Sequence, residues 1–206
     1  MYQCFMHARS AACTALIDSG INTLPVDLRK ISRHYGIKMV SYSHCSFFHF
    51  LHPDVVSSDG FITQIDDIKV IFVNDLEDND RRRFTIGHEL GHALLNHPCD
   101  VIHTRHDEDD NPGEPMEMQA NLFSRSVIAP ACVLHTIGVT DPPGIMRVCD
   151  ISLASAAILS KRLEVFRRRG RMLYNLQEKQ LLNQFAGYIE DYKKNNRPGT
   201  EMAPNR

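Results

Sequence analysis

The stretch RFTIGHELGHALLNH, residues 83–97, contains the pattern HExxH and constrains the fold more than any other part of the sequence. Successive helical residues turn by about 100°, so His88 and His92 would lie one turn apart on nearly the same face. Both imidazoles can then reach one metal ion, with Glu89 beside the same space as a general base. The neighbouring residues are uncharged, which predicts a buried helix at about 81–97.

Gly91 lies inside this predicted helix, where a glycine costs about 1 kcal/mol relative to alanine. That cost indicates that another segment packs very close to the helix at this turn. The alternative is that the helix simply tolerates the glycine.

A catalytic zinc site usually has three protein ligands and a water, so the two histidines need a third partner. The candidates downstream are His97, His103, His106 and the acids from Asp107 to Glu117. His97 comes nine residues after His88, about 180° round the helix, and faces away unless the helix has already ended. His103 and His106 match no short metzincin spacing and lie in or beside a predicted acidic loop at 106–115.

A second predicted helix, at about 115–128, offers a better third ligand. Its apolar residues repeat at helical intervals and would face the core: Met116, Ala120, Phe123 and Val127. Glu117 and Asn121 occupy the adjoining face one turn apart. We expect Glu117 to bind the metal and Asn121 to accept the free ring N–H of a metal-bound histidine. Glu114 precedes Pro115 and is interpreted as an acid at the helix start.

The remaining patterns predict an α+β fold, in which a small antiparallel sheet packs against the HExxH helix and a mostly helical C-terminal half follows. Two N-terminal helices precede a strand at 37–43, and residues 61–74 predict a β-hairpin. We expect the second hairpin strand, 68–74, to expose an edge with which an extended peptide could pair. A helical hairpin is predicted at about 143–167.

Composition limits the class of protein further. With 206 residues, 43% of them hydrophobic, the chain can bury a real core, and a net charge of -2 predicts no global attraction to nucleic acid or anionic membranes. No run of 18 apolar residues and no signal peptide is evident. Six cysteines without a CxxC pair are typical of free thiols in a reducing cytosol, so we expect a cytoplasmic location and no membrane partner.

Residues 1–170 are predicted to form one domain, and 171–206 a helical extension that ends in a disordered polar tail from about Lys193. The helical hairpin and the basic stretch at 161–171 together have some features of a helix-turn-helix. Because no aromatic or glycine motif for nucleic acid accompanies the charges, we expect no direct nucleic-acid binding.

The two central predicted helices together resemble those of the ImmA/IrrE family of metallopeptidases. In this sequence RFTIGHELGHALLNH is followed about 20 residues later by EMQANLFSRSVIAP, and the family shows an HELGH-like helix followed by a helix with E-x-x-A-N. The resemblance covers roughly residues 25–165 and is specific in these two helices. Ser124 stands where alanine is common in the family, a mild departure that leaves the ligands intact.

The resemblance implies a zincin-like fold with one zinc ion per chain, held by His88, His92 and Glu117, with Glu89 as the catalytic base and Asn121 in support. It also implies an intracellular endopeptidase that cleaves a specific protein, most often a helix-turn-helix repressor in mobile elements or stress responses. The alternative is a non-proteolytic zinc-binding regulator that acts by binding its partner. Glu89 favours the enzyme, because a purely structural site needs no general base.

Overall fold

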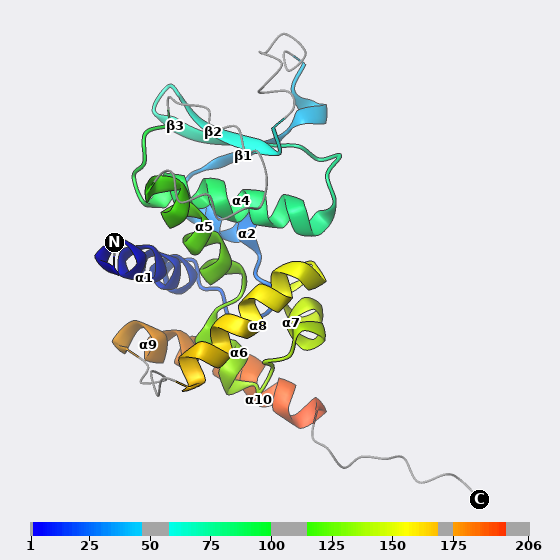
Figure 1. Ribbon diagram of the computed structural model, residues 1–206. Helices are drawn as coiled ribbons and strands as arrows, with labels where there is room; N and C mark the ends of the chain where they lie inside the picture. Colours follow the sequence, from blue (N-terminus) through cyan, green and yellow to red (C-terminus); the bar gives the residue numbers. More distant parts are fainter. Residues whose placement is uncertain (1, 47–57, 100–114, 169–174, 197–206) are drawn as a thin grey trace, which may run out of the picture.

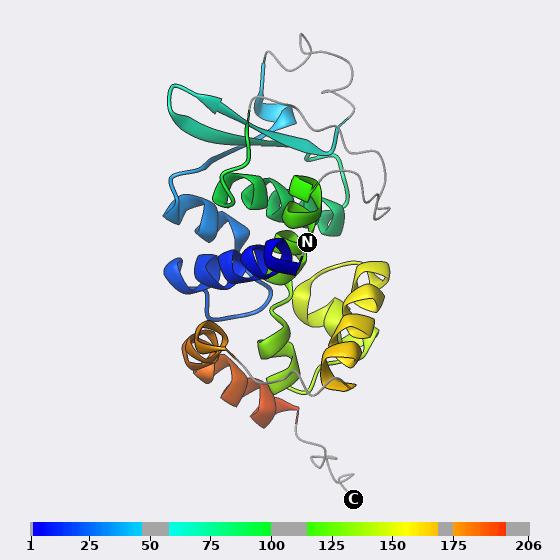
Figure 2. The same cartoon turned by 60° about the vertical axis from the view of Figure 1, so that its left-hand side comes forward.

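The computed structural model describes residues 2–46, 58–99, 115–168 and 175–196 (Figure 1). The elements of the N-terminal half are α1 (Tyr2–Asp18), α2 (Leu28–His34), β1 (Lys38–Ser41), η1 (Tyr42–His44), β2 (Gly60–Ile65), β3 (Ile68–Val73) and α4 (Asn79–Leu94). Those of the C-terminal half are α5 (Pro115–Ile128), α6 (Ala131–Thr136), α7 (Pro142–Cys149), α8 (Leu153–Arg168), α9 (Leu176–Gln184) and α10 (Ala186–Asn195). Figures 1 and 2 show the sheet at one end of the molecule, α4 and α5 beneath it, and α6 to α10 at the other end.

The sheet confirms the α+β class but is mixed, with the strand order β1-β3-β2. β2 and β3 form the expected antiparallel hairpin, turning at Asp66 and Asp67, whose φ angles of 46° and 64° are those of a type I′ turn. β1 pairs parallel with β3, so the expectation of a wholly antiparallel sheet is wrong. The segment between β1 and β3 includes η1 and all of β2, and it is long enough for the crossover that a parallel pair needs.

The central position of β3 corrects a second expectation. Both backbone edges of β3 are hydrogen-bonded, one to β1 and the other to β2, so this strand has no edge for a peptide. Among the described strands, β1 and β2 are the edges of the sheet. Of the described strands, only these two can pair with an added peptide.

One face of the sheet packs on α4. Ile71 and Val73 of β3 are buried in the same core cluster as Ile86 and Leu90 of α4. Strand residues alternate between faces, so Val70 and Phe72 lie on the opposite face, in a separate small cluster. The sheet therefore covers one side of the HExxH helix.

The other side of α4 packs against α5, and two glycines allow an unusually close approach. A Cβ added to Gly91 would lie 3.0 Å from the Cα of Ala120 and 3.2 Å from its carbonyl oxygen. A Cβ added to Gly87 would lie 2.6 Å from the Oγ of Ser124. That hydroxyl donates a hydrogen bond to the carbonyl of Phe84 at 2.8 Å. The backbone of α5 at Ala120 and the hydroxyl of Ser124 thus occupy the space that side chains on α4 would take, as the position of Gly91 indicated.

The C-terminal helices share the core of the N-terminal ones. Leu181 and Phe185, at α9, are fully buried in the same cluster as Leu16 of α1. Gln184 adds two hydrogen bonds from its side-chain amide, to the carbonyls of Leu16 and Ile21. The predicted boundary at 170–171 lies outside the described residues. Of the tail predicted from about Lys193, the first residues belong to α10, which continues to Asn195, and the rest lies outside the described residues.

The predicted helical hairpin is present as α7 and α8, which meet at an angle of 116°. Asp150, between them, adopts a left-handed conformation with φ 55°. Among the described helices no single one is long and apolar enough to cross a membrane, although this bent pair reaches that length and composition when taken together.

A pair of Gly→Ala substitutions tests the close packing of α4 on α5. Gly91→Ala should lower the free energy of unfolding by about 1 kcal/mol, because overpacking costs about 1–3 kcal/mol and helix propensity returns about 1 kcal/mol. Gly187→Ala in α10 is the matched control, because a Cβ there meets nothing within 4 Å. It should leave stability unchanged or raise it by up to about 1 kcal/mol. Urea unfolding measures both, and equal effects of the two substitutions would contradict the packing argument.

Candidate metal centre

The HExxH residues lie in the most buried part of α4. Every residue from Thr85 to Ala93 is buried, and the exposed fractions of His88, Glu89 and His92 are 1%, 6% and 1%. Polar groups at such positions need partners, because an unsatisfied buried polar group is costly. The partners of the two histidines come from α5 and from the turn that follows α4.

Glu117, in the first turn of α5, faces both histidines. Its Oε2 lies 3.1 Å from His88 Nε2, and its Oε1 lies 3.2 Å from His92 Nε2. The two Nε2 atoms lie 2.9 Å from each other. The structure therefore brings together the three residues that the sequence suggested as metal ligands, with all ligand atoms within 4.8 Å of one another.

Asn121, one turn after Glu117 on α5, lies behind His88. Its Oδ1 is 3.1 Å from His88 Nδ1. An amide oxygen can only accept, so Nδ1–H of His88 donates to Asn121. A neutral His88 then has its lone pair on Nε2, directed at Glu117 and His92.

This set of donor atoms fits a metal ion. Imidazole nitrogens and a carboxylate oxygen are the ligands of catalytic zinc sites, which keep a further position for water. With neutral imidazoles the lone pairs and the carboxylate repel one another unless a cation lies between them. Two histidines and one glutamate are therefore the residues that would hold a zinc ion.

Glu117 is ionised and available as a ligand. Burial raises the pKa of this carboxyl, but without a metal the hydrogen bonds from His88 and His92, and the charge of these rings when they are protonated, outweigh it and hold the pKa well below its usual range. A carboxylate needs no proton removed before it binds a metal.

His97 lies in this centre, because the helix ends before this residue, the condition under which the sequence did not expect it to face away. α4 ends at Leu94 and not at 97, and Asn96 turns the chain through a left-handed conformation with φ 56°. His97 thereby returns beneath His92, where it is 8% exposed. Asn96 followed by Pro98 is a helix-stop signal, and it could have located this turn from sequence alone.

The other candidate ligands, His103, His106, the acids at 107–110 and Glu114, lie outside the described residues. Their roles stay as the sequence suggested.

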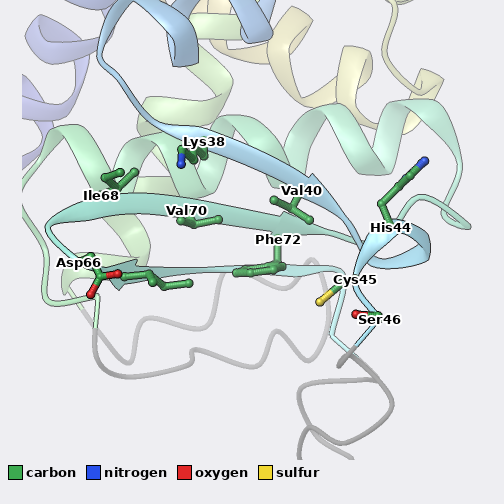
Figure 3. A pocket seen from close by; sticks show the side chains of 10 residues that line it. Lys38, Val40, His44, Cys45, Ser46, Asp66, Ile68, Val70 and Phe72 are labelled. Carbon is green, nitrogen blue, oxygen red and sulfur yellow. The ribbon is translucent and has the colours of Figure 1, made fainter.

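A cavity of about 330 Å³ lies elsewhere, on the face of the sheet that carries Val70 and Phe72 (Figure 3). Ile71 and Val73 face α4, so this cavity is separated from the metal centre by the sheet itself. Its lining includes no residue of the HExxH motif. Binding there would not bring a ligand to His88 or His92.

Removal of single ligands should abolish or weaken zinc binding. We expect one zinc ion per chain in the unaltered protein, loss of it in His88→Ala and His92→Ala, and severely weakened binding in Glu117→Ala. Glu114→Ala is the control and should keep full occupancy, since the sequence predicts that this residue is an acid at the helix start and not a ligand. Metal content after dialysis, measured by mass spectrometry, gives the stoichiometry. Full occupancy in Glu117→Ala would move the third ligand to another residue.

Comparison with models of protein families gives a match. Residues 47–140 match the model of the Peptidase_M78 family, described as the IrrE N-terminal-like domain. No curated protein matches the chain significantly. The matched range includes α4, α5 and every residue of the candidate centre. This match, together with the paired α4 and α5 motifs, supports the assignment of the chain to the ImmA/IrrE family of metallopeptidases.

Proposed function

We propose that this chain is a zinc-dependent endopeptidase that hydrolyses one peptide bond in a specific intracellular protein, a helix-turn-helix repressor. The observation that carries the proposal is the meeting of His88, His92 and Glu117 around one point, with Glu89 next to His88 on the same buried helix. The family match supports the peptidase class. The substrate rests on the resemblance to the family, and the cytoplasmic location rests on that resemblance and on the six cysteines without a CxxC pair.

His88, His92 and Glu117 would hold the metal. A bound zinc ion would polarise the scissile carbonyl and lower the pKa of a bound water molecule to about 7. The protein contributes the close packing of α4 on α5, which holds the three ligands in position.

Glu89 has the proton-transfer role. Its carboxylate would take a proton from the attacking water as oxygen adds to the scissile carbonyl carbon. The same carboxyl would return that proton to the amine nitrogen as the carbon–nitrogen bond breaks. A residue that only supported a structural metal would have no need to be an acid at this position.

β2 is the edge strand best placed to present a peptide to this centre. A Cβ added to Gly60, the first residue of β2, would lie 2.7 Å from Cγ2 of Thr85 on α4. Glu89 is one helical turn beyond Thr85. An extended segment of the substrate that paired with the outer side of β2 would therefore run close to α4 and its acid.

Glu89→Gln is the direct test of catalysis. The substitution should reduce cleavage of a cognate repressor by at least about 100-fold, because general acid–base catalysis contributes about 10²–10⁴. Zinc content should stay at the level of the unaltered protein. Repressors encoded near the gene are the substrates to try, with fragments identified by mass spectrometry. Glu164→Gln, on the exposed surface of α8, is the matched control and should leave cleavage unchanged.

Two outcomes would contradict the proposal. A repressor that is inactivated without being cut would favour the binding-only regulator. Equal cleavage by Glu89→Gln and the unaltered protein would remove Glu89 from the proton transfer.

A further inference from the structure

His97 and Gln119 form a hydrogen-bonded chain behind His92. His97 Nδ1 lies 3.1 Å from His92 Nδ1, and His97 Nε2 lies 2.9 Å from Oε1 of Gln119 on α5. The rings of His92 and His97 meet edge to face, with centroids 5.0 Å apart. His92 and His97 are thus joined through their Nδ1 atoms, and the other ring nitrogen of His97 contacts the amide of Gln119.

The backbone holds His97 in this position. Its N–H donates to the carbonyl of His92 at 3.0 Å, which closes the turn after α4. The thiol of Cys99 donates to the carbonyl of His97 at 3.4 Å. The turn therefore fixes the position of the His97 side chain. The hydrogen-bond partners of its ring then decide which ring nitrogen carries the proton.

The amide sets the direction of the hydrogen bonds. Gln119 Oε1 can only accept, so the proton of a neutral His97 is on Nε2 and its lone pair is on Nδ1. That lone pair accepts from Nδ1–H of His92. A neutral His92 then has its own lone pair on Nε2, which faces His88 and Glu117.

We propose that His97 and Gln119 are positioning residues that fix the tautomer and ring orientation of His92 for metal binding. The inference rests on the metal site of the proposed function, and it needs no assumption about the substrate. Asn121 acts directly on His88, whereas Gln119 acts on His92 through His97. Both amides belong to α5, so the helix that brings Glu117 also orients the two histidines of α4.

Substitutions at Gln119 test the direction of the hydrogen bonds from His92 through His97 to Gln119. Gln119→Glu keeps an acceptor for His97 and should keep zinc affinity within a few-fold of the unaltered protein. Gln119→Met fills similar space without an acceptor and should weaken zinc binding by about 10–100-fold, the usual effect of losing such a partner. Gln119→Lys presents a donor, which reverses the chain and places a proton on His92 Nε2. It should bind zinc more weakly than Gln119→Met.

The measurement is the zinc dissociation constant, obtained by competition with a chromophoric chelator at fixed pH. Gln180→Met, at an exposed position on α9, is the matched control and should leave the constant unchanged. Thermal unfolding of the metal-free variants checks that each is folded. Nitrogen-15 NMR of the histidine rings reports the tautomers, and His92 should be protonated at Nδ1 in the zinc-loaded protein.

A double substitution isolates the role of His97. In a His97→Phe background the ring is kept but the hydrogen bonds are lost, so Gln119→Met should cause no further loss of affinity. Additive losses would mean that Gln119 acts independently of His97 and would overturn the inference.

The outcomes separate this inference from the proposed function. Equal zinc affinities for Gln119→Glu, Gln119→Met and Gln119→Lys would overturn the positioning role and leave the metal site and the peptidase proposal intact. Failure of the unaltered protein to bind zinc would overturn both.

Discussion

The close contact between α4 and α5 is the constraint on which the rest of the molecule depends. Gly87 and Gly91 add no side chain of α4 to the contact, so the Ser124 hydroxyl lies against Gly87 and the α5 backbone at Ala120 lies against Gly91. At this separation the carboxylate of Glu117 reaches both His88 and His92. Van der Waals contact between two helices thereby determines the geometry of the candidate metal centre.

The same contact explains how several polar groups are accommodated in the core. His88 and His92 are almost fully buried, and burying them has a desolvation cost that good partners must offset. α5 supplies these partners along one helix: Glu117 to both rings, Asn121 to His88, and Gln119 through His97. A shift of α5 would disturb the ligand and the orienting amides together, so the centre is expected to respond to packing changes as a unit.

The local features of the centre were predictable from the sequence, because they depend on residues close together along the chain. The HExxH spacing located α4, and the pattern of apolar residues located α5 at 115–128. Asp66 and Asp67 sit at the hairpin turn, where short acidic residues tolerate a positive φ. Each of these signals is a matter of helical or strand periodicity, or of turn chemistry.

Three features escaped that reasoning, each for a physical reason. The parallel pairing of β1 with β3 and the central place of β3 depend on a crossover, and alternation along a strand carries no information about its neighbours. The position of His97 was missed because the helix was extended to residue 97 and not ended before Asn96.

By itself the sequence determined which side chains can bind a metal and which helices present them, because helical spacing alone places His88, Glu89 and His92. Only the tertiary structure decided that Glu117 meets both histidines, that β2 and not β3 is an edge beside α4, and that His97 and Gln119 stand behind His92. These contacts join residues distant in sequence or separated by a turn. They are set by how closely two helices and a sheet can pack, a property of the folded whole.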